Sequence, residues 1–243
     1  MADVEDLLKR CSVDSVVALF DEISEVLFWV KDCRHRVTDL NLAFAERVKM
    51  PRSEVIGKTD AELYFPEFAQ IFMEDDRRVY QTGDPMRRKI ELLSSRHAGV
   101  EWRSTTKLPL RDKHGTVVGT IGISRPLPNS VDALPIPYRA IGKIVEYAKT
   151  RLSYGVTVVD LASQASMSVA TLERRFREHL RLSPRAFLGQ LRVSLACELL
   201  RDTPLNMTEI ALECGYDSPA AFSRAFRREM DVPPTEFRLR SRA

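Results

Sequence analysis

The residues best suited to chemistry in this chain are arginines that recur beside small side chains at an offset of fifty positions. The stretch FREHLRLSPRAF begins at Phe176, and FRREMDVPPTEF repeats its pattern from Phe226. Arginine can bind a phosphate or the O6 and N7 atoms of guanine through two parallel hydrogen bonds. Small neighbours leave room for a close approach to base edges. A repeat of this kind indicates one structural unit used twice.

Each copy predicts a short helix, a sharp turn and a longer helix, which is the shape of a helix-turn-helix. The first copy reads VTVVDLASQA, SMS and VATLERRFREHL, and the second reads NMTEIALEC, GYDSP and AAFSRAFRREM. Asn206 and Glu209 have the spacing of a capping box. Ser183–Pro184 and Ser218–Pro219 each place an N-cap residue before a proline at the first helical position. Gly215 is expected to end its helix in a left-handed conformation.

Helical periodicity predicts which side of each second helix faces away from the core. At 100° per residue, Leu172 and Phe176 share an inward face, as do Phe222 and Phe226. The opposite, outward face of each helix carries small side chains near its N-terminus with arginines beside them. Two such faces suit double-stranded DNA, although a single one would equally well be an ordinary solvated surface. The residues predicted to contact DNA are Ser168, Ala170, Glu173, Arg174, Arg177, Ser218, Pro219, Ala220, Ser223, Arg224 and Arg227.

Among these residues, we expect Arg174 and Arg224 to matter most for DNA binding. Glu173 could accept a hydrogen bond from cytosine N4, or it could repel phosphate and weaken the first unit.

Residues 136–240 resemble the AraC/XylS type of DNA-binding domain. The matching residues are Leu161–Ala162, Leu172, Phe176, Ser183–Pro184, Phe187, Leu191–Arg192, Ala196, Leu199–Leu200, Ile210–Ala211, Cys214–Tyr216, Phe222–Phe226, Pro233–Pro234 and Phe237–Arg238. The resemblance implies two helix-turn-helix units joined by a long helix. Their recognition helices would then enter successive major grooves about 34 Å apart. Arg181 and Asp231 stand where this family often has glycine.

The first half of the chain has a mixed pattern. Apolar periodicity predicts a helix over 13–26, with one stripe formed by Val16, Leu19, Phe20, Ile23 and Val26. Strands are predicted over 27–32, 36–41, 86–95, 101–110 and 116–125, with helices over 41–50 and 68–84. This order favours an α+β domain, in which an antiparallel sheet carries its helices on one side.

Residues 13–128 resemble a PAS domain in the motifs FWVKD, DLNLAF, VIGKTDAELYFPE, DDRRVYQTGDP and TTKLPLRDKHGTVVGTIGISR. The resemblance implies a five-stranded antiparallel sheet that can enclose a small organic ligand. An alternative is that the apolar residues simply fill the core. Candidate pocket residues are Phe28, Phe44, Leu63, Phe72, Trp102 and Ile121.

The predicted organisation is an extension over residues 1–12, a PAS-like sensory or dimerisation domain over 13–128, a proline-rich linker over 129–137 and an all-α double helix-turn-helix domain over 138–243. The apolar stripe that begins at Leu7, Leu8 and Cys11 could pack on the sheet, or it could pair with its twin in a homodimer.

No cofactor or metal is expected. Haem would need an axial ligand, and His35, His97 and His114 fall in or beside turns and loops. A covalently bound flavin would need a cysteine on a suitable helix, whereas Cys33 follows the first strand. The four cysteines lie far apart, so neither a disulfide framework nor a zinc site is predicted. An unidentified small organic effector and a ligand-free dimerising module both remain open.

Charge separates the two halves. Residues 131–243 carry 17 basic and 13 acidic side chains, and 15 of the basic ones are arginine, whereas residues 1–130 have a net charge of −1. Arginine enrichment favours the second half as the DNA-binding one. Neither a membrane span nor a signal peptide is predicted, so a cytoplasmic location is expected.

These features predict a sequence-specific transcription regulator. By the family resemblance, it would be an activator that works with RNA polymerase. No enzymatic activity is expected, because no nucleophile–base pair, phosphate loop or metal motif is present. Two alternatives are a DNA-repair enzyme with a reactive cysteine and a protein-interaction adaptor with a degenerate DNA-binding half. The setting of Cys33, between Asp32 and Arg34, does not match the Pro-Cys-His-Arg setting of such repair enzymes.

Overall fold

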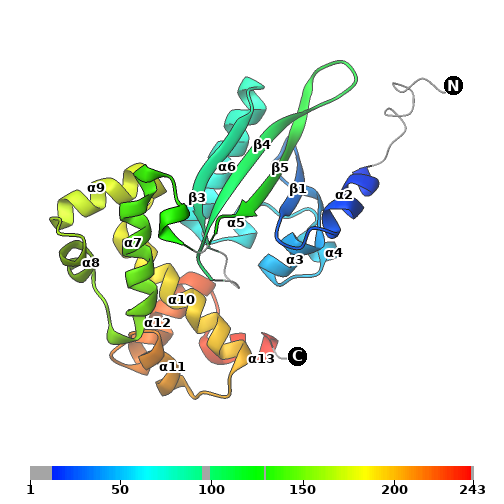
Figure 1. The fold of residues 1–243 in the computed structure, drawn as a ribbon. Coiled ribbons are helices and arrows are strands. Elements are labelled where there is room, and N and C mark those ends of the chain that lie inside the picture. Colours follow the sequence, from blue (N-terminus) through cyan, green and yellow to red (C-terminus); the bar gives the residue numbers. More distant parts are fainter. Residues whose placement is uncertain (1–12, 95–98, 129, 242–243) are drawn as a thin grey trace. The chain divides into compact units, whose positions relative to one another are not determined.

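The computed structural model describes residues 13–94, 99–128 and 130–241 (Figure 1). The chain divides into two compact units. The first comprises the residues up to Leu63 together with Phe72–Ile90 and Arg103–Pro126. The second comprises Tyr64–Ile71, Glu91–Trp102 and the residues from Leu127 onward.

A single five-stranded sheet has the strand order β2-β1-β5-β4-β3. Its strands are β1 (Leu27–Asp32), β2 (Val37–Leu40), β3 (Met86–Leu93), β4 (Glu101–Arg111) and β5 (Val117–Pro126). β1 pairs antiparallel with β2 and β5, and β4 pairs antiparallel with β5. A tight turn joins β4 to β5, with Gly115 at a φ of 82°. The predicted antiparallel sheet is therefore confirmed.

The two faces of the sheet differ sharply in chemistry. Phe28 and Val30 pair with Ile123 and Ile121, and all four point toward helix α2 (Val13–Asp21) because paired side chains share a face. Lys31 and the other alternate residues point to the opposite face. That face is covered by helices from the segment between β2 and β3, namely α3 (Leu42–Val48), α4 (Arg52–Val55), α5 (Asp60–Leu63) and α6 (Pro66–Thr82).

Helix α2 is shorter than predicted, and it packs differently. It ends at Asp21, and two successive turns lead the chain into β1. The predicted stripe is only partly right: its member Phe20 packs on the sheet, but it does so together with Val17, which was not predicted to face the sheet. A helix of nine residues can place only about two turns against the sheet, so other apolar side chains stay outside. The exposed ones are Val16, Leu19 and Ile23. The expectations for Leu7, Leu8 and Cys11 fall outside the described residues.

One buried polar side chain connects the first elements of the chain. Asn41 is 0% exposed. Its Oδ1 accepts hydrogen bonds from the backbone N–H groups of Phe28 and Phe44, and its Nδ2 donates to the carbonyl oxygens of Phe20 and Val26. All four hydrogen-bonding positions of the amide are therefore used. Asn41 ties α2, β1 and α3 together.

The second half is helical, as predicted. Its elements are η1 (Val131–Ala133), α7 (Ile136–Thr150), η2 (Leu152–Tyr154), α8 (Val158–Gln164), α9 (Val169–Leu180), α10 (Pro184–Asp202), α11 (Met207–Glu213), α12 (Pro219–Met230) and α13 (Pro234–Ser241). Helices α8 and α9 form the first helix-turn-helix, α11 and α12 form the second, and α10 connects them (Figure 1). Phe226 packs edge-on against Phe222 and Phe237, with ring centroids 5.7 and 5.5 Å apart.

The predicted helix caps are present. Asn206 and Glu209 form the capping box, and the Ser183 and Ser218 hydroxyls accept from backbone N–H groups at the starts of α10 and α12. Arg181 and Asp231 hold the left-handed conformation after α9 and α12, so these non-glycine residues adopt the conformation that glycine favours. These local determinants fix where each helix starts and stops.

The two helix-turn-helix turns are related but not identical. In each, a backbone N–H bonds to a carbonyl five residues earlier, Met167 to Ala162 and Tyr216 to Ala211, as in a Schellman motif. The left-handed position holds Ser166 in the first turn and Gly215 in the second. The second turn is one residue longer than the first.

Within the residues that the structure describes, no helix is long and apolar enough to cross a membrane. The same residues contain no cluster of three or more histidine, cysteine or acidic side chains that could hold a metal ion.

Candidate nucleic-acid interface

Helix α9 presents the predicted outward face of the first unit. Ser168 caps the helix by accepting from the Thr171 backbone N–H at 3.2 Å. Leu172 and Phe176 are fully buried, so the helix is fixed by its apolar side. The residues on the opposite side are all exposed, namely Ser168, Ala170, Glu173, Arg174 and Arg177.

Helix α12 presents the same arrangement in the second unit. Phe222 and Phe226 are fully buried, which fixes the rotation of the helix about its axis. Ala220, Arg224 and Arg227 are exposed, whereas Ser218, Pro219 and Ser223 are half-buried. The rotational prediction made from periodicity is therefore confirmed for both helices. The contact of these residues with DNA remains a prediction.

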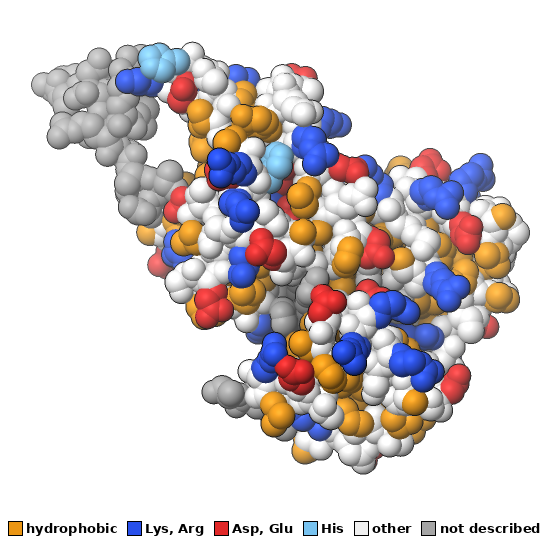
Figure 2. Space-filling model, turned by 180° about the vertical axis from the view of Figure 1, so that it is seen from behind, with side chains coloured by type: hydrophobic (Ala, Val, Ile, Leu, Met, Phe, Trp, Pro, Cys, Tyr) orange, Lys and Arg blue, Asp and Glu red, His pale blue; other side chains and the backbone are white. Residues whose placement is uncertain are grey.

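The arginines of both faces are available to a ligand. Across the described ranges, Arg174, Arg177, Arg224 and Arg227 make no ion pair or side-chain hydrogen bond. Figure 2 shows that Lys and Arg side chains on the visible side are interspersed with acidic ones and do not form one continuous basic surface.

The structure distributes the candidate pocket residues over different places. Phe28 and Ile121 lie on the α2 face of the sheet. Phe44 lies on the other face, 6.0 Å from Trp29 between ring centroids, and Phe72 lies there beneath the Lys107 amine. Leu63 is buried in α5 of the first unit, and Trp102 is buried in the second unit. These six residues therefore do not line one common pocket.

The helix-covered face of the sheet instead holds a buried ion network that sequence patterns did not reveal. Asp76 of α6 accepts from the Lys31 amine at 2.7 Å and from the Thr120 hydroxyl at 3.3 Å, and its other ion-pair partner is Lys107 at 2.9 Å. Asp60 is the second partner of Lys31, at 2.6 Å. The side chains are almost fully buried. The charges of two lysines and two aspartates thus cancel between the sheet and the helices that cover this face.

Electrostatics within this network favour the charged forms. Burial alone would raise the pKa of Asp76, but the ammonium groups of Lys107 and Lys31 lower it to about 2. Burial alone would lower the pKa of Lys31, but Asp60 and Asp76 raise it above its ordinary value. Asp76 and Lys31 are therefore both charged at neutral pH.

Trp29 adds an unsatisfied donor on the same face. Its Nε1–H is buried and has no hydrogen-bond acceptor among the residues that the structure describes. An ideal Cβ on Gly122 would lie 2.5 Å from the indole ring, so the absence of a side chain there is what lets the ring lie flat on β5. A ligand with a hydrogen-bond acceptor could satisfy this donor.

Among the described cysteines, Cys33 is exposed in the turn after β1. Cys197 and Cys214 are buried. Burial raises the pKa of Cys214 to about 12, so its thiol is not a nucleophile at neutral pH.

Comparison with known proteins matches both halves of the chain to families. Residues 161–240 match the family model of a helix-turn-helix domain, and residues 20–131 match that of a PAS fold. The first match covers most of α8 to α13, and the second covers the sheet and its helices.

Curated relatives match the helical half. The HTH-type transcriptional regulator MtrA of Neisseria gonorrhoeae is 38% identical over 78 residues, which are 32% of this chain and 26% of MtrA. The HTH-type transcriptional activator RhaS of Salmonella arizonae is 40% identical over 78 residues, which are 32% of this chain and 28% of RhaS. The matched region therefore spans about a quarter of the length of each relative.

Among solved structures, the DNA-binding domain of AdpA, a global transcriptional factor in complex with a target DNA, is 33% identical. The match covers 42% of this chain and 93% of that domain, with a TM-score of 0.41.

Proposed function

We propose that the chain, which matches the models of a helix-turn-helix domain over residues 161–240 and of a PAS fold over residues 20–131, is a sequence-specific DNA-binding transcription regulator of the AraC type. The observation that carries the proposal is the pair of matched, exposed faces on α9 and α12, each with unpaired arginines beside small side chains. Such faces suit base edges and phosphates in the major groove.

Each recognition helix has its own contact chemistry. Arg174 and Arg224 occupy matching positions and are the best placed for bidentate contact with guanine. Ala220 leaves room near the start of α12 for base edges. Glu173 occupies the position that Ser223 holds in the second helix, so the two units should prefer different bases.

The proposal extends to the effect on transcription and to the protein partner. In keeping with the name of RhaS, a transcriptional activator, we propose that the chain activates transcription and works with RNA polymerase. The relatives named above are transcriptional regulators, so the comparisons give no support to the repair-enzyme alternative. We also propose a cytoplasmic location, because chromosomal DNA is the proposed partner.

The test of the function is DNA binding by the full chain. Duplexes enriched by the wild-type protein from a random pool serve as the probe, and fluorescence anisotropy measures affinity. Arg224→Ala should weaken binding about 10- to 100-fold and relax the preference at one base pair, because a bidentate arginine contact contributes about 1–3 kcal/mol of discrimination.

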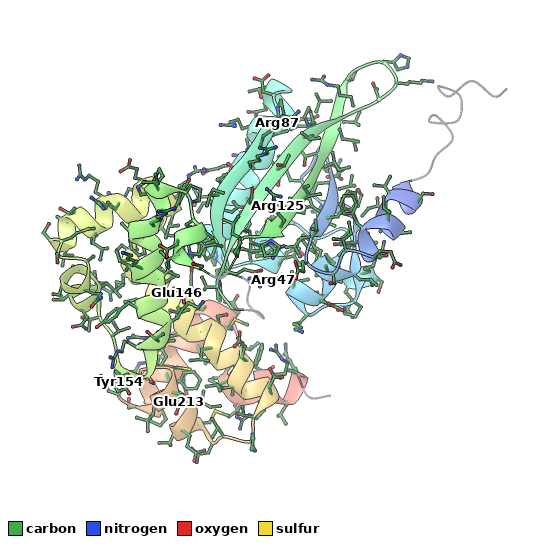
Figure 3. All side chains as sticks on the ribbon, in the orientation of Figure 1. Arg47, Arg87, Arg125, Glu146, Tyr154 and Glu213 are labelled. Atoms are coloured by element: carbon green, nitrogen blue, oxygen red, sulfur yellow. The ribbon has the colours of Figure 1, made fainter. Side chains whose placement is uncertain are left out.

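The matched control is Arg87→Ala, an exposed arginine of β3 that removes the same charge from the sheet (Figure 3). It should change affinity by no more than about twofold, since Arg87 belongs to the other compact unit and not to a proposed recognition helix. Failure to enrich any sequence, or equal effects of the two substitutions, would overturn the assignment.

The apolar side of α2 supports a homodimer. Leu19 and Val16 of α2 are exposed, Leu19 to 66%, and Ile23 is exposed just after the helix ends. An apolar stripe of this kind on a short helix is suited to a second copy of the chain. Leu19→Glu should therefore convert a dimer into a monomer, measured by native mass spectrometry.

Ile56→Glu, which charges another exposed apolar residue of the first unit, is the control and should leave the dimer intact. A wild-type monomer, or a Leu19→Glu dimer, contradicts this mode of association.

We also propose that the first half binds a small organic effector. The same mass spectra would detect a bound effector as extra mass on the protein. The buried Trp29 donor favours a molecule with a hydrogen-bond acceptor.

A further inference from the structure

One side chain of the connecting helix α10 reaches both helix-turn-helix units. Arg192 lies near the middle of α10 and is half-buried. Its Nη2 donates a hydrogen bond to the carbonyl oxygen of Val156 at 2.8 Å, just before α8. Its guanidinium carbon lies 5.4 Å from the centre of the Tyr216 ring, in the turn between α11 and α12. The two contacts belong to different units of the repeat.

The backbones of the two units also meet at this point. A Cβ on Gly215 would lie 2.1 Å from the carbonyl oxygen of Leu152 and 3.2 Å from the Cα of Gly155. Only glycine therefore allows the second turn to lie directly against η2. Figure 3 shows the same neighbourhood, where Tyr154 of η2 and Glu213 at the end of α11 are labelled.

The chemistry of Arg192 suits a clamp between two parts. A planar guanidinium can donate along its edge while its face stacks on an aromatic ring, which a lysine ammonium cannot do. Burial raises the pKa of Tyr216 to about 12, so the ring remains a neutral phenol. The Nε–H of Arg192 is buried without an acceptor among the described residues. A buried donor without an acceptor lowers the stability of the fold, so stability alone does not account for an arginine at this position.

We propose that Arg192 is a positioning residue that holds the two helix-turn-helix units in one relative orientation. This inference rests on the proposed function, since a fixed orientation is what allows α9 and α12 to occupy two grooves at one spacing. When two binding units are rigidly linked, the second binds as an intramolecular event, and loosening the link lowers the overall affinity without changing either contact.

Spin-label distances test the clamp without DNA. Labels at Ala170→Cys and Ala220→Cys report on α9 and α12. Cys11 and Cys33 are replaced by serine so that they do not take up the label, whereas Cys197 and Cys214 are buried and can stay. Double electron–electron resonance should give one narrow distance in the parent protein, a broad distribution for Arg192→Met and an intermediate one for Arg192→Lys. Arg185→Met, which changes an exposed arginine of the same helix, should stay narrow.

DNA binding gives the second readout. Arg192→Met should bind the enriched duplex about tenfold more weakly than wild type and should tolerate one or two base pairs inserted between the half-sites, whereas wild type should not. When the bases read by one of the two helix-turn-helix units are scrambled, the duplex should bind wild type and Arg192→Met equally. Combining Arg192→Met with Tyr216→Leu should add little further loss, because both remove the same contact.

The outcomes separate the two proposals. A distance distribution for Arg192→Met as narrow as that of the parent overturns the clamp, whatever the DNA result. Broadening without any DNA binding by the wild-type chain keeps the clamp and overturns the proposed function. Thermal melting distinguishes a loosened domain from an unfolded one, since Arg192→Met should keep a cooperative transition close to that of Arg185→Met.

Discussion

Asp76→Ala is expected to lower the free energy of unfolding of the sheet-containing part by about 3–5 kcal/mol, because it leaves Lys31 and Lys107 buried without their shared anion. Urea unfolding followed by tryptophan fluorescence measures the effect. Both tryptophans of the chain, Trp29 and Trp102, lie in strands of the sheet.

The adjacent Asp75→Ala is the matched control. Asp75 pairs with Lys89, whose side chain is 25% exposed and can recover its hydration when the carboxylate is removed. The control should therefore lose only about 1 kcal/mol, in the range of partly exposed ion pairs. Equal losses for the two variants would contradict a special role for the network.

Acid should act on the same network with a defined sign. Because the folded pKa of Asp76 is lowered to about 2, its contribution to stability is present above the unfolded pKa of about 3.9 and is lost as pH falls from there through the folded value. Asp76→Asn cannot titrate, so its unfolding free energy should fall less steeply over this window than that of the wild type.

Asn41→Asp is expected to be nearly as damaging at neutral pH, with a loss of about 3 kcal/mol or more. The new carboxylate would keep the acceptor for Phe28 and Phe44 but would replace a donor with an anion facing two carbonyl oxygens. Since burial beside acceptors raises the pKa of such a carboxyl, lowering the pH to about 5 should recover part of the loss.

The same substitution at an exposed cap is the control for Asn41→Asp. Asn206 uses only its side-chain oxygen, which accepts from the N–H groups of Thr208 and Glu209. Aspartate caps a helix about as well as asparagine, so Asn206→Asp should change stability by no more than about 0.5 kcal/mol. An Asn41→Asp protein as stable as this control would rule out the four-bond role of the amide.

Much of the fold could be predicted because its determinants are local. β1 has the bounds read from LFWVKD, and the caps at Ser183, Asn206 and Ser218 fall where serine or asparagine precedes a helical pattern. The faces of α9 and α12 followed from periodicity alone. Each is a long helix with bulky residues four apart on one side, so only one rotation buries them.

The interior of the first half could not be predicted in this way. Alternation in β1 separates Phe28 and Val30 from Trp29 and Lys31, but it does not say which set meets the main group of helices. The apolar set faces α2, and the set containing Lys31 faces the helices. Lys31 and Asp76 are 45 positions apart, and no local pattern marks two such residues as partners.

The role of Arg192 was hidden for the same reason. It was recognised only as one residue of the connecting helix, because its partners at Val156 and Tyr216 are distant in sequence. The contacts depend on how two separately predictable units pack against each other. Sequence patterns describe each unit but not the junction between them.

The turns of the two helix-turn-helix units differ in which substitutions they can accept. Serine already occupies the left-handed position of the first turn, so that site accepts a side chain, whereas Gly215 has the backbone of η2 against it. Substitutions at the left-handed position are therefore expected to be tolerated before α9 and to displace backbone before α12.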